Sequence, residues 1–366
     1  MIATSASGFV INVSAYVLCF GGHLQGSYKD APYLKEVYQQ TKHACECGYV
    51  VGDEHRRVTT SEQEAKMQEG TTVILSEPEQ LPDKKRGRYK TKISVVNTDS
   101  LTAVKQLLGR GCKSPAILNM ANAYHPGGSV EQGAKAQEES LFRCSNYYRS
   151  LDPACNTHLK EKIERLLPNM LAQRRVRGVP EVDENSEYLI PVDGVIYSPG
   201  VTVFRDGAHE YAYVDQPFQV DMIACAAFDR NPLHVKGDIS SHVGQDSPQD
   251  TVVTVDGARV LVKAEGLYRE GMRQKLLSIL RTACNQSSDS IVLGAFGCGA
   301  FDDEKHTNRT TVIDLLQEIF QSGEFTGVFK EIVFAVLESN SLNYKTFRDA
   351  FDGTSFVFSK SSFLRN

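Results

Sequence analysis

Short runs of apolar and β-branched residues alternate with amphipathic segments from residue 91 onward. In three segments apolar residues recur at the i, i+3, i+4 spacing of a helix face. These faces are Leu101, Val104, Leu107 and Leu108; Leu276, Ile279, Leu280 and Ala283; and Val312, Leu315, Leu316 and Ile319. The expected strands are 92–97, 116–119, 194–197, 221–226, 290–294 and 331–337, with 355–358 as a further candidate. This alternation predicts an α/β fold in which helices cover both faces of a mixed or mostly parallel sheet.

The first 90 residues follow a different pattern. Segments 31–49 and 61–69 are polar and rich in Ala, Glu, Lys and Gln, a composition that favours helix. Segment 76–89 combines two prolines with four basic residues, which predicts an exposed connection. We therefore expect residues 1–90 to form a mostly helical N-terminal extension with a basic linker, and residues 91–366 to form the main domain.

Composition narrows the class of protein. The chain has 366 residues, 23% of them charged, and a formal net charge of −5, so no sequence-wide basic surface indicates nucleic-acid binding. Nine cysteines at irregular spacing are not a disulfide framework and favour a reducing compartment, either cytoplasmic or nucleocytoplasmic, or a host cytosol if a pathogen delivers the protein. Secretion is the less favoured alternative, because the apolar run 6–22 lacks a basic leader. No segment has the length and hydropathy of a membrane span.

The most informative segment is 118–141, which follows an expected strand. Residues 126–129, Pro-Gly-Gly-Ser, carry little side-chain bulk, so backbone N–H groups there can approach an anionic ligand closely. After seven further residues come Gln137, Glu138 and Glu139, at the expected start of a helix. In a sheet of this kind, ligands bind where strands end at their carboxyl side. The segment thus predicts a binding loop followed directly by carboxylates.

A second glycine-rich segment, 294–301, follows the apolar run 291–293. Its order, G-x-x-G-x-G, matches neither the dinucleotide fingerprint nor the phosphate loop of nucleotide hydrolases. Backbone amides in such a loop can still surround a diphosphate, and Phe296 or Phe301 offers a ring to pack against a sugar or base. The alternative is a plain strand-to-helix turn. Cys298 lacks a His or Asp partner pattern, so we interpret it as a small loop residue.

Together the two loops resemble a known family. Asn119 and Asn122, followed by Gly127 and Gly128, resemble the N-x-x-N pattern and glycine loop of macrodomains, the ADP-ribose-binding α/β/α fold. The order Gly-Gly-Ser, seven residues, Gln-Glu-Glu resembles the signature of poly(ADP-ribose) glycohydrolases, particularly the microbial type. Segments 196–206 and 220–227 are also typical of that group. The resemblance spans roughly residues 91–340 and implies a three-layer, macrodomain-like α/β/α sheet.

The resemblance also implies roles for residues. Glu139 would be the catalytic acid/base and Glu138 would help to hold the ribose on the leaving side. Asn122 would bind the distal ribose, residues 127–130 and 297–301 would enclose the diphosphate, and Gln137 would orient the loop or the substrate. The implied ADP-ribose-binding set is Asn119, Asn122, Gly127, Gly128, Ser129, Val130, Glu131, Gln137, Phe296, Gly297, Cys298, Gly299, Ala300 and Phe301, with Phe301 packed against the distal ribose. No metal or cofactor is expected.

Physical chemistry agrees with these roles. Cleavage of a ribosyl C1″ bond passes through an oxocarbenium-like state, so the leaving oxygen must be protonated and a water then activated. One carboxyl group can do both in sequence. Adjacent helix residues point about 100° apart, so Glu138 and Glu139 are expected to have different roles rather than to act as a glycosidase pair on one face.

Two positions depart from the family pattern. Ser129 stands where the family has a glycine, and Glu131 adds a carboxylate that is either solvent-exposed or available to a cationic leaving group such as a guanidinium. The expected function is hydrolysis of terminal ribose–ribose bonds of poly(ADP-ribose), releasing ADP-ribose. The alternatives are hydrolysis of ADP-ribose linked to protein, for example to arginine, and binding of ADP-ribose without cleavage. Because both glutamates are retained, the sequence favours an enzyme. Its expected partners are ADP-ribose conjugates, with no direct role for nucleic acid or membrane.

Overall fold

The computed structural model describes residues 24–51, 56–59, 61–179, 182–230, 251–255, 258–262, 264–302, 306–338 and 342–352. The apolar run 6–22 and the candidate strand 355–358 lie outside these residues. No helix in the described ranges is both long enough and apolar enough to span a membrane.

A seven-stranded mixed sheet forms the centre of the molecule, in the order β3-β6-β7-β5-β10-β11-β4. Parallel pairing joins β4 (Lys92–Val96), β11 (Glu331–Ala335), β10 (Ser290–Leu293), β5 (Pro115–Met120) and β7 (Ala212–Cys225). Antiparallel pairing adds β6 (Val195–Asp206) beside β7 and β3 (Thr72–Ile74) beside β6. The expected mixed sheet is confirmed.

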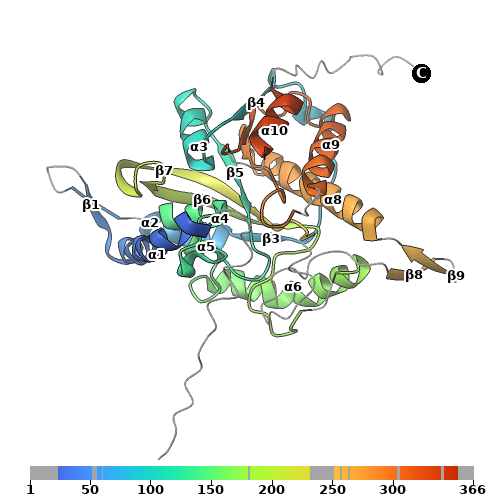
Figure 1. Cartoon of the computed structure of the whole chain (residues 1–366), viewed down its shortest axis with the longest axis horizontal. Coiled ribbons are helices and arrows are strands. Elements are labelled where there is room, and N and C mark those ends of the chain that lie inside the picture. The colour runs from blue at the N-terminus through green and yellow to red at the C-terminus, as the bar shows by residue number, and fades with distance from the viewer. Residues whose placement is uncertain are drawn as a thin grey trace, which may run out of the picture.

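The central strands β5 and β10 bury both of their faces, because alternate side chains enter two different cores. In β5, for example, Ile117 belongs to one core and Leu118 to the other. One face is covered by α8 (Ala264–Asn285), α9 (Thr307–Gln321) and α10 (Asn343–Phe351) (Figure 1). The other face carries α3 (Ser100–Gly109), α4 (Gln137–Cys144), α5 (Tyr148–Leu151) and α6 (Thr157–Val176). The three layers and the apolar faces expected on α3, α8 and α9 are confirmed.

The N-terminal part is built into the same body. It contains α1 (Leu24–Cys47), a hairpin of β1 (Tyr49–Val51) and β2 (Arg56–Val58), and α2 (Ser61–Gly70). The helices expected at 31–49 and 61–69 are present, although α1 begins earlier and ends at Cys47. Because β3 is an edge strand of the main sheet, residue 90 does not mark a break in that sheet; the proposed domain boundary there stays a prediction.

The linker 76–89 is mostly exposed and is anchored at two points. It contains a short 3₁₀ helix, η2 (Asp83–Lys85). Leu81 is buried, and its N–H donates to Glu324 Oε1 at 3.2 Å. Arg281 Nη1 donates to the carbonyl oxygen of Pro78 at 2.9 Å. The expectation of an exposed connection is confirmed for most of the segment, and Leu81 is its buried exception.

Strands β6 and β7 are longer than expected and form an extended hairpin. A register shift between Ser198 and Val201 places an irregularity at Gly200, whose φ is +60°. The Gly200 N–H donates to Asp221 Oδ1 at 2.9 Å, which replaces a ladder hydrogen bond at the irregularity. A second, separate hairpin consists of β8 (Thr251–Val255) and β9 (Ala258–Val262).

The parallel strands bring the two glycine-rich loops together. β5 and β10 are neighbours in the sheet, and each loop leaves its strand at the carboxyl end. The loop after β5 contains a short 3₁₀ helix, η3 (Val130–Gln132), and leads into α4. The loop after β10 leads to α9. Both therefore lie at the edge where sheets of this type bind ligands.

Candidate active site

Glu138 connects the first loop to α4. Its Oε1 accepts hydrogen bonds from Asn119 Nδ2 and from the Gly127 N–H, both at 3.2 Å. Its Oε2 accepts from the Asn122 N–H at 2.7 Å. The side chain is 3% exposed. Glu138 thus binds three donors that come from the end of β5 and from the turn beyond it.

Glu139 has a different set of partners. Its Oε1 accepts from the Ser129 N–H at 3.0 Å. Its Oε2 is buried and has no hydrogen-bond partner among the described residues. One carboxylate oxygen is therefore fixed by the glycine turn. The other is buried, and its hydrogen-bonding capacity is unused. A buried polar atom without a partner is uncommon in proteins and is found at functional sites more than elsewhere.

The glycine turn approaches both carboxylates closely. Gly127 and Gly128 have φ values of +80° and +56°. A Cβ added at Gly128 would lie 2.7 Å from Glu139 Oε1 and 3.1 Å from Glu138 Oε2, so no side chain fits there. The expectation that these side chains point apart holds for their Cβ directions only, because both carboxyl groups turn toward Gly128. Their different hydrogen bonds still separate their roles.

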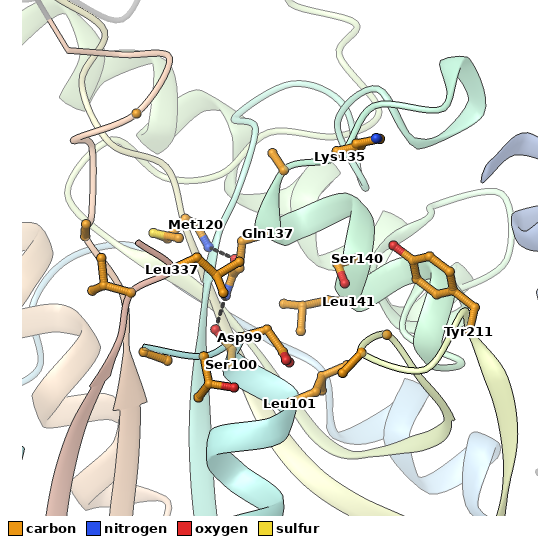
Figure 2. A pocket seen from close by; sticks show the side chains of 18 of the residues that line it. Asp99, Ser100, Leu101, Met120, Lys135, Gln137, Ser140, Leu141, Tyr211 and Leu337 are labelled. Carbon is orange, nitrogen blue, oxygen red and sulfur yellow. Dashed lines mark hydrogen bonds between the residues drawn. The ribbon is translucent and has the colours of Figure 1, made fainter. Parts of the chain in front are cut away.

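Asn122 and Gln137 hold the backbone around the turn. Asn122 Oδ1 accepts from the N–H groups of Tyr124 at 2.9 Å and His125 at 3.0 Å, as in an Asx turn. Gln137 Oε1 accepts from the Met120 N–H at 2.9 Å, and its Nε2 donates to Ser100 Oγ and to the Leu118 carbonyl oxygen (Figure 2). The start of α4 is thereby fixed to the end of β5.

Burial shifts the acidity of both glutamates. Burial and the nearby Glu139 carboxylate raise the pKa of Glu138 to about 8, and the N–H donors from Asn122, Asn119 and Gly127 limit that rise. Burial also raises the pKa of Glu139, opposed by the Ser129 N–H and by the positive charge of Arg143. Both carboxyl groups are therefore available as proton donors at a higher pH than an exposed glutamate.

Side-chain amides hold the second glycine loop. Asn308 Nδ2 donates to the carbonyl oxygens of Gly297 at 2.9 Å and Phe301 at 2.7 Å. Asn343 Nδ2 donates to the Cys298 carbonyl oxygen at 2.8 Å. Asn308 is itself fixed by the hydroxyl of Tyr268. The loop thus has a defined shape without any carboxylate bonded to its N–H groups in the residues that the structure describes.

Two residues expected in this loop's binding surface lie elsewhere. The Phe296 ring is 2% exposed and packs in the core beneath α8 and α9, so it offers no face to a sugar or base. Cys298 is also buried, and burial raises the pKa of its thiol. The loop amides therefore do not lower the pKa of this thiol, and Cys298 is interpreted as a small loop residue. Gly299 and Ala300 are exposed, whereas Phe301 is partly buried and packs against the core.

The structure gives Ser129, Val130 and Glu131 separate positions. Ser129 has a φ of −103°, which any residue adopts, so its Cβ causes no backbone strain. Val130 is 2% exposed and belongs to the core. Glu131 Oε1 forms an ion pair with Lys42 Nζ at 2.6 Å, and its Oε2 accepts from Gln39 Nε2 at 3.1 Å. Glu131 is therefore solvent-exposed, as one of the two expectations had it, and is also bound to α1.

A cavity of about 990 Å³ lies beside the first turn of α4. Gln137, Met120 and Gly299 line it from the two loops, and Leu337 and Asp99 line it from the ends of β11 and β4 (Figure 2). Glu138 and Glu139 are not in its lining. The start of α4 contributes Gln137, Ser140 and Leu141 to the lining, so the two glutamates next to Gln137 lie on a different face of that helix. No cluster of three metal-ligating side chains occurs within the described ranges.

Sequence reasoning missed several residues that shape this site. Asn308 and Asn343 are single polar residues at the starts of helices, and no spacing marks them out. Lys42 lies 89 residues before its partner Glu131. The only available signal was the apolar face of α1. Its residues Val37, Tyr38 and Ala44 are buried, which indicates that this helix packs against the rest of the protein near Lys42.

Comparison with known proteins identifies the relatives of this arrangement. Residues 38–206 match the family described as microbial-type PARG, catalytic domain. That match starts within α1, earlier than the resemblance from residue 91 had indicated, and it includes both asparagines of the first loop and both glutamates. No curated protein matches the chain.

Solved structures resemble the chain over most of its length. Poly(ADP-ribose) glycohydrolase from Thermomonospora curvata, bound to the inhibitor ADP-HPD, is 26% identical with a TM-score of 0.60, and the likeness covers 87% of this chain and 100% of that one. The corresponding enzyme from Deinococcus radiodurans, in complex with ADP-ribose, is 26% identical with a TM-score of 0.53, covering 79% of this chain and 97% of that one. Family model and structural likeness agree: residues 38–206 of this chain are similar to the microbial-type poly(ADP-ribose) glycohydrolase catalytic domain, and the fold is similar to that of bacterial enzymes of this type.

Proposed function

We propose that this protein hydrolyses the ribosyl C1″ bond at the end of poly(ADP-ribose) and releases ADP-ribose, with Glu139 as the acid and then the base. The observation that carries the proposal is the state of the Glu139 carboxyl group. One oxygen is fixed by the Ser129 N–H, and the other is buried beside the glycine turn without a partner. A carboxyl group in that setting is positioned to exchange a proton with one substrate atom.

The steps balance with this one group. The Oε2 proton of Glu139 passes to the leaving ribose oxygen as the C1″–O bond breaks, which leaves an oxocarbenium-like ribose and a carboxylate. The carboxylate then takes a proton from a water molecule as the water oxygen bonds to C1″. Glu139 returns to its protonated form, and ADP-ribose is free. Its raised pKa lets the protonated starting state persist to a higher pH than in an exposed glutamate.

Glu138 has a supporting role in this scheme. Its three N–H donors come from residues 119–127, so it fixes the turn against α4 and sets where a ribose between them would lie. The oxygen of Asn119 is buried without a partner in the described part of the chain, next to Glu138. We assign Glu138 and Asn119 to positioning of the distal ribose.

We place the adenosine half of the ligand in the adjoining cavity. At about 990 Å³ it is large enough for a nucleoside, and its lining combines apolar Leu337 and Met120 with the polar groups of Asp99 and Gln137. Gly299 brings the second loop to its rim. A diphosphate between the two glycine loops would then connect the cavity to Glu139, which accounts for the separation of cavity and carboxylates.

The partners of Glu131 favour a neutral leaving group. An arginine-linked ADP-ribose would present a guanidinium, and Glu131 is the extra carboxylate that was a candidate to receive it. Lys42 already neutralises that carboxylate at 2.6 Å. A guanidinium would have to displace this lysine, whereas the ribose hydroxyl oxygen of poly(ADP-ribose) needs no counter-charge. Arginine-linked substrates are accordingly the less favoured alternative.

The test compares substrates and one substitution. Purified protein is incubated with poly(ADP-ribose) and, separately, with arginine-ADP-ribosylated protein, and free ADP-ribose is quantified. We expect release from the polymer, a loss of at least about 100-fold in kcat for Glu139→Gln, and unchanged affinity of that variant for ADP-ribose. Glu161→Gln, an exposed glutamate on α6, is the matched control. Release only from the arginine-linked substrate would refute the proposal, and binding without any release would assign the protein to ADP-ribose readers.

A further inference from the structure

Helix α1 lies against the segment 129–136, which we call the η3 loop because it contains η3. Lys42 Nζ is 2.6 Å from Glu131 Oε1, and Gln39 Nε2 donates to Glu131 Oε2 at 3.1 Å. Nearer the start of the helix, Asp30 Oδ2 is 2.5 Å from Lys135 Nζ. Two ion pairs therefore fix the two ends of the η3 loop to one helix. In the first, α1 contributes the cation, and in the second it contributes the anion.

The contact extends to the backbone and to α4. Gly133 has a φ of +80°, and a Cβ there would lie 2.5 Å from the Ala31 carbonyl oxygen, so the loop touches the α1 backbone. The Thr41 hydroxyl donates to the Arg143 carbonyl oxygen at 2.7 Å, in a buried contact at the last turn of α4. Figure 1 shows α1 beside α4. The helix thus contacts both segments that hold the carboxylates, although it contributes no carboxylate to that site.

The η3 loop transmits this contact to Glu139. Ser129, at its start, donates its N–H to Glu139 Oε1 at 3.0 Å. The Ser129 carbonyl oxygen in turn accepts from the N–H groups of Gln132 at 3.1 Å and Ala134 at 3.2 Å. These bonds make the loop a compact unit, so a displacement at Glu131 moves Ser129 as well. The Ser129 N–H, together with the backbone N–H of Glu139 itself, also lowers the pKa of the Glu139 carboxyl group.

We propose that α1 is a positioning element for the reaction, in which the Lys42–Glu131 ion pair holds the η3 loop so that Ser129 orients the Glu139 carboxyl group. This inference rests on the proposed function. Lys42 and Glu131 are positioning residues, since neither touches the carboxylates directly. Asp30 and Ala31 lie before the matched family segment, which starts at residue 38, so part of this support is outside the catalytic domain as that family model defines it.

The test reverses and then restores the ion pair. Lys42→Glu and Glu131→Lys each place like charges together, and the double substitution Lys42→Glu/Glu131→Lys restores opposite charges in swapped positions. We expect each single variant to lower kcat on poly(ADP-ribose) about tenfold, with a smaller change in KM, because a partly exposed pair has a modest energy. The double variant should recover to within about threefold of the original kcat.

Two controls separate positioning from general stability. Lys160→Glu reverses an ion pair of 2.7 Å with Glu187 that is remote from the site, and Lys35→Glu makes the same charge change on the exposed face of α1. Neither should change kcat. The single variants should also move the alkaline limb of the pH profile to higher pH, because weakening the Ser129 N–H bond removes a contact that lowers the pKa of Glu139. Glu138 and Arg143, the charged groups nearest Glu139, stay unchanged in every variant.

Defined outcomes decide between the alternatives. A double variant as slow as the single ones, or an equal loss in Lys160→Glu, would overturn the inference. If the unmodified protein releases no ADP-ribose, the proposed function fails, and hydrogen exchange then tests α1 separately. Exchange of the Ser129 amide should be faster in Lys42→Glu and return to the original rate in the double variant. Unchanged exchange in Lys42→Glu would refute the positioning role whatever the activity.

Discussion

The two glycine loops have the same place in the fold but are held by different chemistry. The loop after β5 is fixed by carboxylates, with Glu138 and Glu139 accepting from its N–H groups. The loop after β10 is fixed by amides, with Asn308 and Asn343 donating to its carbonyl oxygens. In the first loop the N–H groups are engaged by the protein's own acids. In the second, side-chain amides bind the carbonyl oxygens, and the N–H groups of Phe296 and Cys298 donate to backbone carbonyl oxygens within the loop.

This difference divides the work of the site. A carboxyl group can carry a proton, so the first loop has both the geometry and the acidity for bond cleavage. A side-chain amide does not titrate, so the second loop has a shape that is constant with pH and is suited to binding. Changes in the first loop should therefore affect kcat, and changes in the second should affect KM. A variant that does not follow this pattern would contradict the division of roles between the two loops.

The largest effect is expected for Gly128→Ala. The new Cβ would meet Glu139 Oε1 at 2.7 Å in a backbone conformation with φ of +56°, so the carboxyl group or the turn must shift. A displacement of about 1 Å at a catalytic group costs on the order of 100-fold in rate. We expect a fall of that size in kcat, measured by ADP-ribose release from poly(ADP-ribose) at saturating substrate.

Gly299→Ala provides the matched substitution in the second loop. No atom lies within 4 Å of a Cβ there, and its φ is not in the left-handed region. Its kcat should stay within about twofold of the original value, because an alanine in open space with ordinary backbone angles imposes little strain. Equal losses in both variants would mean that the two loops contribute to the same step, and the division would be wrong.

A smaller effect is expected for Asn308→Ala. This side chain donates to the carbonyl oxygens of Gly297 and Phe301. Its removal leaves the Gly297 carbonyl oxygen without this donor, whereas the Phe301 carbonyl oxygen still accepts from the Arg230 N–H. Leaving buried polar groups unsatisfied costs about 1–3 kcal/mol, so the loop should lose its defined shape. We expect KM to rise about tenfold and kcat to change by less than about threefold. A fall in kcat that matched Gly128→Ala would contradict the assignment of this loop to binding.

The first loop was far more predictable from sequence than the bonds that hold it. Contiguous features carried the prediction: a strand, small residues in a turn, and Glu138 and Glu139 at a helix start. The bonds of Asn308 and Lys42 depend on residues that are distant in the chain, and a lone Asn or Lys has no pattern that indicates its partner. The convergence of Glu138 and Glu139 on Gly128 follows from side-chain torsions, which helical spacing does not specify.

In the fold, too, local patterns were predictable from the sequence and contacts between distant residues were not. Helix faces on α3, α8 and α9 were predictable because each is a local repeat of apolar residues. The lengths of β6 and β7 were not, since Pro199 and Gly200 have the composition of a turn. Asp221 on the neighbouring strand accepts the Gly200 N–H and so lets β6 continue through this irregularity. Phe296 was misplaced because its ring enters the same core as Ile291 and Leu293, although the alternation of β10 would place it with Val292 on the other face.

The last prediction concerns stability against pH rather than rate, and of the two loops it involves the first. The pKa of Glu138 is raised to about 8 in the folded chain, whereas an exposed glutamate in the unfolded chain has an ordinary value. Between those two pKa values the folded state holds a proton that the unfolded state has lost. The contribution to stability is therefore complete at low pH and is lost as pH rises through about 8.

Urea unfolding between pH 5 and 9 measures this slope. We expect the free energy of unfolding to fall by on the order of 1 kcal/mol per pH unit across most of that range, with the slope reduced in Glu138→Gln. The absolute stability of that variant is irrelevant, because only the slope reports the lost titration. Glu161→Gln should keep the original slope. Asn308→Ala should also keep the original slope, since segment 294–301 contains no carboxyl side chain. If the slope disappeared in that variant, the two loops would be electrostatically coupled and not divided.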